Sequence, residues 1–104
     1  MFVVTSDVKP GSSRDEFVEW YETVHISDVT STEGVPRAHF FESIEGTGPE
    51  FLCAYEIEGT DLTEVMKGVR AHTPKLVSEG RIIDSFALHM ARPFALRYSS
   101  PGPE

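Results

Sequence analysis

The order in which strand-like and helix-like segments follow one another constrains the fold of this chain most strongly. Residues 2–8 favour an extended backbone because Val3 and Val4 are β-branched. A helix is expected over residues 14–25, where four apolar side chains recur at the spacing of one helical face: Phe17, Trp20, Tyr21 and Val24. Residues 26–32 are rich in Ser, Thr and Asp, which favour caps and turns, so a break or a short extra turn is expected there.

The middle of the chain has the pattern of a β-hairpin. One strand is expected over residues 35–44 and another over residues 50–58, with a short glycine-containing link between them. In the second of these strands alternate positions are apolar, so one face is expected to be buried by Phe51, Cys53, Tyr55 and Ile57.

The last two segments are a helix and a strand. The helix is expected to begin at a cap provided by Thr60 or Asp61 and to be limited by Pro74, because the residue before a proline avoids helical geometry. The final strand is expected over residues 82–92. The resulting order, β-α-β-β-α-β, is the ferredoxin-like pattern, so the expected class is α+β, with an antiparallel sheet and two helices on one face.

A single domain accounts for the patterned part of the chain. We expect that domain to span residues 1–98 and a loose tail to span residues 99–104. A domain of this size buries only a modest core, and two helices on one sheet face leave the other face uncovered. Pairing with a second copy is the simplest cover for that face, so a homodimer is expected.

Composition excludes several classes of partner. The net charge is −8, from 17 acidic and nine basic residues with no basic stripe, which disfavours nucleic-acid binding. No apolar run approaches the roughly 20 residues that span a bilayer, and the first residues have no signal-peptide pattern. Cys53, the only cysteine, cannot form an internal disulfide and is interpreted as a core residue. A cytoplasmic protein without membrane or nucleic-acid partners is therefore expected.

Two segments resemble a known group of proteins. The run Phe-Val-Glu-Trp-Tyr-Glu-Thr-Val-His at residues 17–25, then Asp28, then Gly-Val-Pro-Arg-Ala at residues 34–38, resembles the dimeric α/β-barrel superfamily, in particular its EthD-like branch. The segment FLCAYEIEG at residues 51–59 is similar to the third strand of that branch.

The resemblance implies both an assembly and a type of ligand. Two ferredoxin-like subunits would join their sheets in a dimeric α/β barrel, and a cleft in each subunit would hold a small, often aromatic or lactone-like molecule. Such proteins include polyketide cyclases, lactone isomerases, cofactor-free monooxygenases and haem-handling enzymes, so the fold alone does not choose a reaction.

Two residues of the first helix are the candidate catalytic groups. A neutral imidazole at His25, in a partly apolar cleft, can take or give a proton near pH 7. Tyr21, four residues earlier, can hydrogen-bond a substrate carbonyl or enolate oxygen. The alternatives are a structural histidine, bonded to a carbonyl or to Asp28, and a tyrosine at the edge of the core.

Five further side chains are candidates for substrate binding: Trp20, His39, Phe41, Tyr55 and His89. His89 is expected to share a strand face with Ser85, Ala87 and Ala91, opposite Phe86, Leu88 and Met90. A structural role is the competing interpretation for both strand histidines, and His72 is expected to contact a helix end. The histidine spacings match no metal motif, and no phosphate or dinucleotide loop is present, so no metal or cofactor is expected.

These patterns lead to one expected function with two alternatives. We expect a cofactor-independent enzyme that binds a small hydrophobic, oxygenated molecule, polyketide-like or aromatic, and cyclises, dehydrates or isomerises it by histidine-mediated proton transfer. A cofactor-free monooxygenase and a non-catalytic ligand-binding dimer both remain open.

Overall fold

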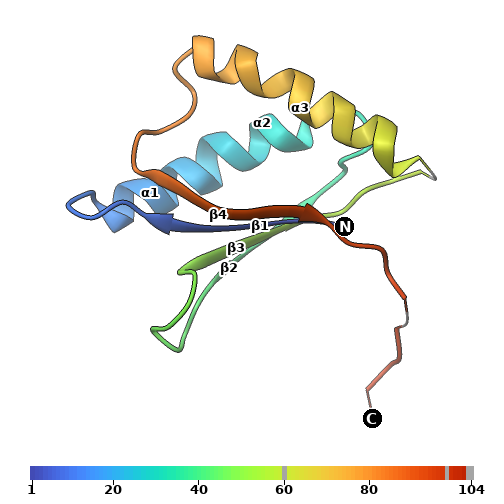
Figure 1. The fold of residues 1–104 in the computed structure, drawn as a ribbon, viewed down its shortest axis with the longest axis horizontal. Coiled ribbons are helices and arrows are strands. Elements are labelled where there is room, and N and C mark those ends of the chain that lie inside the picture. The colour runs from blue at the N-terminus through green and yellow to red at the C-terminus, as the bar shows by residue number, and fades with distance from the viewer. Residues whose placement is uncertain (60, 98, 103–104) are drawn as a thin grey trace.

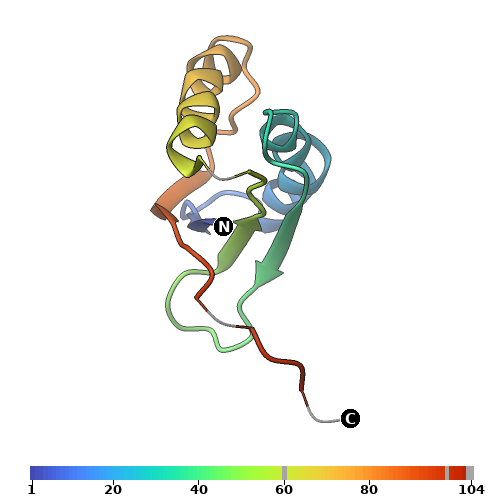
Figure 2. The same ribbon diagram turned by 90° about the vertical axis from the view of Figure 1, so that its right-hand side faces the viewer.

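One antiparallel sheet forms the base of the molecule. The computed structural model describes residues 1–59, 61–97 and 99–102. The strand order is β2-β3-β1-β4, with bounds β1 Phe2–Val8, β2 Ala38–Glu42, β3 Phe51–Tyr55 and β4 Phe86–Pro93. All helices lie on one face of this sheet, and no helix or strand among the described residues covers the other face (Figures 1 and 2). The expected α+β class and antiparallel sheet are confirmed, and the arrangement is compatible with a ferredoxin-like fold.

The first helical layer is continuous over three consecutive segments. These are α1 (Arg14–Trp20), a π-helical turn η1 (Tyr21–His25) and α2 (Ile26–Thr30). Ser13 caps the start, where its hydroxyl accepts a 3.2 Å hydrogen bond from the Glu16 amide, as the capping-box spacing predicts. Helical backbone continues through the Ser- and Thr-rich segment, which therefore forms the short extra turn and not a break.

The core lies between this helical layer and the two central strands. Its fully buried members are aromatic or small: Phe17 and Tyr21 from the helix meet Phe51, Cys53 and Tyr55 from β3. The alternation predicted for the third strand is thus confirmed at those three positions. Both hairpin strands are shorter than expected, but their antiparallel pairing is as predicted.

The second helix, α3 (Leu62–Ser78), corrects one expectation. Pro74 lies inside the helix and does not limit it. A proline removes one backbone hydrogen bond, but Leu76 beyond it is buried and holds the chain against the core. The helix ends at Ser78 and is followed by Gly80, whose φ is +70°. The Arg81 amide donates a hydrogen bond to the Leu76 carbonyl and the Gly80 amide donates one to the Val77 carbonyl, in the pattern of a Schellman motif. Asp61 caps the start of α3, whereas Thr60 lies outside the described residues.

A β-bulge in the edge strand β4 corrects the expected assignment of its side chains to the two faces of the sheet. Thr5 pairs with Met90 while the next residue, Ser6, pairs with Leu88, so His89 is the extra residue. An extra residue exchanges the two faces of the strand beyond it. Ala91 therefore lies on the helix side and Met90 on the outer side, the reverse of the expected assignment. The strand also begins at residue 86 rather than 82.

No helix in the described part of the chain is long and apolar enough to cross a membrane. Residues 99–102 of the expected tail have no regular secondary structure, and residues 103 and 104 lie outside the described residues.

Candidate functional site

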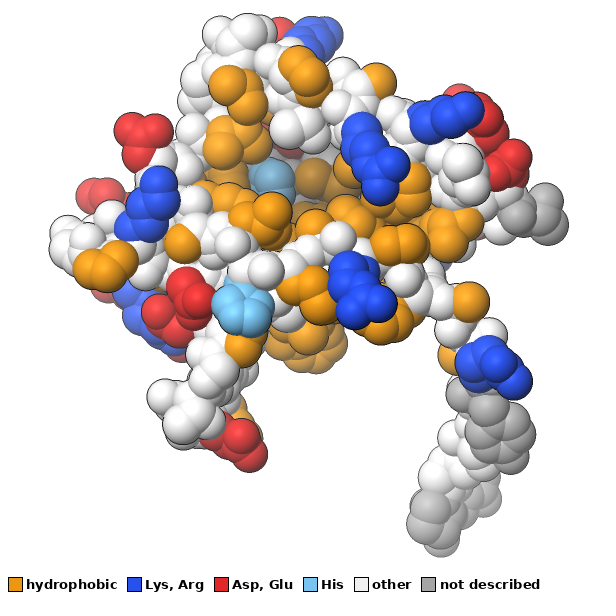
Figure 3. All heavy atoms as spheres, in the orientation of Figure 1, with side chains coloured by type: hydrophobic (Ala, Val, Ile, Leu, Met, Phe, Trp, Pro, Cys, Tyr) orange, Lys and Arg blue, Asp and Glu red, His pale blue; other side chains and the backbone are white. Residues whose placement is uncertain are grey.

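A cavity of about 320 Å³ lies between α3 and the sheet. Hydrophobic side chains surround a hollow between α3 and β4 on the face seen in Figure 3, and pale-blue histidine atoms are visible in its depth. The wall is mostly apolar and comes mainly from three parts of the fold. The sheet provides Phe2, Val4, Tyr55, Phe86, Leu88 and Ala91, the first helical layer provides Trp20, His25 and Val29, and α3 provides Met66, Val69, Arg70, His72, Thr73, Leu76 and Val77. Thr32 and Ile82, in the segments that follow α2 and α3, complete the wall.

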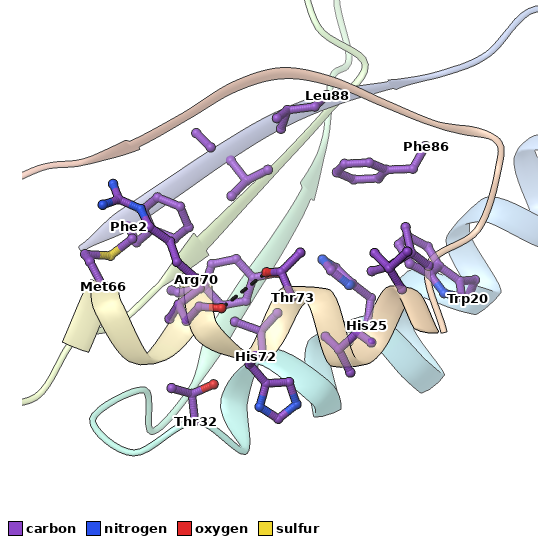
Figure 4. Close-up of a pocket in the computed structure, with 18 residues that line it drawn as sticks. Phe2, Trp20, His25, Thr32, Met66, Arg70, His72, Thr73, Phe86 and Leu88 are labelled. Atoms are coloured by element: carbon purple, nitrogen blue, oxygen red, sulfur yellow. Dashed lines mark hydrogen bonds between the residues drawn. The ribbon is translucent and has the colours of Figure 1, made fainter. Parts of the chain in front are cut away.

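The π-helical turn places His25 in this wall. In a regular α-helix two residues five positions apart point about 140° away from each other. Here the Ile26 amide bonds to the Tyr21 carbonyl, which widens the turn and brings His25 round towards Trp20. Their rings stack with centroids 4.6 Å apart and planes inclined by 22°. Figure 4 shows the imidazole extending from the helix towards Phe86, with Trp20 beside it.

The environment of His25 keeps its imidazole neutral. Burial lowers the pKa of His25 from 6.5 to about 4, and the nearby charge of Asp28 opposes this fall only in part. Nδ1 of the ring is buried and has no hydrogen-bond partner among the described residues. A neutral imidazole carries one donor and one acceptor nitrogen, and the tautomer decides which of the two a ligand in the cavity would meet.

Asp28 does not orient the imidazole. Its carboxylate accepts a 2.7 Å hydrogen bond from Nε of Arg81, in the segment that follows α3. The backbone carbonyl of the same arginine accepts a 2.9 Å bond from the indole of Trp20. This segment therefore fixes the end of the cavity at which Trp20 stacks on His25.

Tyr21 lies in the core beside His25 and not in the cavity wall. It is fully buried, its ring stacks on Phe40 at 4.2 Å, and its edge meets the imidazole at 5.0 Å. Burial, followed by the neighbouring Cys53, raises the pKa of its hydroxyl far above the usual value. The Tyr21 side chain therefore supports the imidazole by packing, and its hydroxyl is not in a position to meet a molecule in the cavity.

Tyr55 and Cys53 are buried in the core beside Tyr21. Tyr55 lines the cavity, and its hydroxyl is buried without a hydrogen-bond partner among the described residues. Burial raises the pKa of the Cys53 thiol to about 11, so the thiol is neutral at pH 7, in keeping with a core residue.

Three of the residues expected to bind substrate lie elsewhere. His39 is on the outer face of the sheet, where Nε2 lies 2.7 Å from a carboxylate oxygen of Glu56. Phe41 is 55% exposed and lines a separate depression. His89, at the bulge, approaches Thr5 at 3.5 Å. Strand alternation places residues on a face but does not say which face the helices cover.

The contribution of α3 to the cavity wall was not predicted from the sequence. Taking Pro74 as the end of the helix removed Leu76 and Val77 from its apolar face and made His72 terminal. His72 instead lies in the interior of α3 and lines the cavity. The signal for this wall was present, because Met66, Val69, Thr73 and Leu76 keep helical spacing across the proline.

The polar chemistry of the cavity resides in a few side chains. Buried atoms without a hydrogen-bond partner belong to three of its residues: Nδ1 of His25, Oγ1 of Thr32 and the hydroxyl of Tyr55. The described residues contain no group of three or more His, Cys, Asp or Glu side chains that could hold a metal ion. No family model, curated protein or solved structure matches the chain.

Proposed function

We propose that this protein binds a small, largely apolar, oxygenated molecule in the cavity and catalyses a cofactor-independent proton transfer on it. Cyclisation, dehydration and isomerisation all belong to this class. The observation that carries the proposal is a mostly apolar cavity wall that contains the neutral imidazole of His25. A small number of polar groups in an otherwise apolar pocket is the arrangement that orients a small oxygenated ligand.

His25 is the proposed acid and base. The imidazole would accept, at the ring nitrogen that faces the cavity, a proton from a carbon beside a carbonyl; the C–H electron pair would form a C=C bond, and the carbonyl oxygen would take the negative charge. The imidazolium would then return the proton to another atom of the same molecule. The enolate charge near the ring raises the pKa that burial had lowered, so the histidine becomes more basic as the reaction proceeds.

A second candidate is a protein that binds such a molecule without transforming it. The low pKa of His25 makes the empty site a weak base, and the carboxylate of Asp28 is engaged by Arg81 and not by the imidazole. Both observations favour a cavity that holds a ligand by shape and hydrogen bonding alone.

We also propose a homodimer formed through the outer face of the sheet, as the resemblance to dimeric α/β barrels implies. The support is an uncovered surface of partly exposed apolar side chains, among them Val3, Phe41, Leu52 and Met90. A reducing compartment such as the cytoplasm is proposed because Cys53 is unpaired and buried.

The deciding experiment follows hydrogen exchange into a bound ketone. We would incubate 2-tetralone with the protein in D₂O and record loss of its protons beside the carbonyl by NMR. Catalysed exchange in the wild type, absent in His25→Gln but retained in His39→Gln on the outer face, is the expected result.

The other outcomes separate the alternatives. Binding without catalysed exchange, seen as a change in the fluorescence of Trp20, supports the second candidate, because this is the only tryptophan and it lines the cavity. If 2-tetralone neither binds nor exchanges its protons, both candidate functions are contradicted. Consumption of dioxygen by the complex would indicate a monooxygenase instead.

A further inference from the structure

The cavity differs in charge from the rest of the molecule. The chain has 17 acidic residues and a net charge of −8. No aspartate or glutamate, however, is found among the described residues that line the cavity, where the only charged side chain is Arg70, on α3. The cavity therefore excludes negative charge from its own wall while presenting a cation, which is the arrangement expected of a site for an anionic group.

Arg70 has no carboxylate partner in the described part of the chain. Several other cations are paired, among them Arg14 with Glu42 and Glu50, and Arg81 with Asp28. One turn before Arg70, on the same helix, Lys67 lies 3.2 Å from a carboxylate oxygen of Glu64. An unpaired guanidinium retains all its donors, and its fork matches a carboxylate in two parallel hydrogen bonds.

The charged side chain and the imidazole lie at opposite ends of the cavity. Figure 4 shows Arg70 reaching from α3 towards Phe2, at the end where Met66 lies. His25, with Trp20 and Phe86, lies at the other end. Side chains such as Val4, Val69 and Leu88 line the space together with them. A ligand that fills this space meets a cation at one end and a neutral imidazole at the other.

Resting on the proposed function, we propose that the ligand of this cavity is an apolar carboxylic acid whose carboxylate pairs with Arg70 and whose body extends to His25. Arg70 is exposed, so the carboxylate keeps part of its hydration and the cost of burying an ion is small. A second oxygen function at the far end of the ligand would meet His25, which places the reacting carbon away from the charged head.

Isothermal titration calorimetry with a matched pair of probes tests this assignment. Naphthalene-1-acetate carries the carboxylate, and naphthalene-1-acetamide has the same apolar body without the charge. The wild type is expected to bind the acetate about fivefold to tenfold more tightly than the amide. Arg70→Gln is expected to abolish that preference without changing amide binding, and Arg70→Lys to retain part of it. Lys67→Gln, which removes a cation outside the cavity wall, is expected to leave the preference intact.

The outcomes distinguish the two proposals. Equal binding of both probes by the wild type, or a preference that survives Arg70→Gln, overturns the assignment of the carboxylate to Arg70 and leaves the apolar cavity standing. Failure of both probes to bind the wild type overturns the ligand cavity and this assignment with it.

Discussion

Replacing His25 with phenylalanine is expected to change how stability depends on pH. Burial lowers the pKa of His25 from 6.5 in the unfolded chain to about 4 in the fold. Between those values the unfolded imidazole binds a proton and the folded one does not, so acid favours unfolding. A difference of this size corresponds to about 3 kcal/mol. The wild type should lose up to that amount of unfolding free energy through this residue as the pH falls from 7 to 4.

Urea denaturation of both proteins at a series of pH values measures this effect. Phenylalanine keeps a ring for Trp20 and Phe86 to contact but has no titrating group. The difference in unfolding free energy between wild type and His25→Phe should therefore be constant above pH 7. It should move in favour of the variant as the pH falls to 4, and then level off. A difference that does not vary with pH, or an NMR titration of His25 with a pKa at or above 6.5, would refute a buried neutral imidazole.

Four further substitutions test the packing. In urea denaturation, Gly34→Ala should lower the unfolding free energy by about 3 kcal/mol and Gly46→Ala by about 1 kcal/mol. Both residues have positive φ, but only at Gly34 would an added Cβ lie 2.8 Å from a Val65 side-chain atom. Equal losses would contradict this close approach. Pro74→Ala should raise thermal stability, by about 2 kcal/mol, since it restores a helix hydrogen bond inside α3, and a lower melting temperature would argue against an uninterrupted helix. Tyr21→Phe should change stability by less than about 1 kcal/mol, because the buried hydroxyl has no partner among the described residues; a loss above about 2 kcal/mol would reveal a hydrogen bond.

The local patterns of the sequence were sufficient for the class of fold. The helical face of Phe17 and Tyr21 and the strand face of Phe51 and Cys53 form the core that their spacing predicts. Both patterns repeat with the period of their element, and the side chains concerned are large enough to dominate packing.

Three departures could not be predicted from the spacing of apolar residues. The π-helical turn is bonded from Ile26 to Tyr21 and lies where Trp20 stacks on His25. The bulge at His89 exists only in the pairing of β4 with β1. Helix α3 passes through Pro74, although a proline alone favours an end.

The candidate site was predictable in part. Trp20, His25 and Tyr55 lie in the cavity wall, because each belongs to the face of its element that turns towards the core. His39 and Phe41 lie on the opposite face of the sheet, and nothing in an isolated strand pattern distinguishes those two faces. Arg70 drew no attention in the sequence because a single exposed arginine on a helix is ordinary, and only the cavity beside it gives it a possible partner.

The most direct test of the account is to locate a bound ligand by intermolecular nuclear Overhauser effects. With 2-tetralone bound, we expect contacts from the ligand protons to Trp20, His25 and Leu88, which lie on different elements around one cavity. Contacts confined to Phe41 and its neighbours on the outer face of the sheet would contradict it.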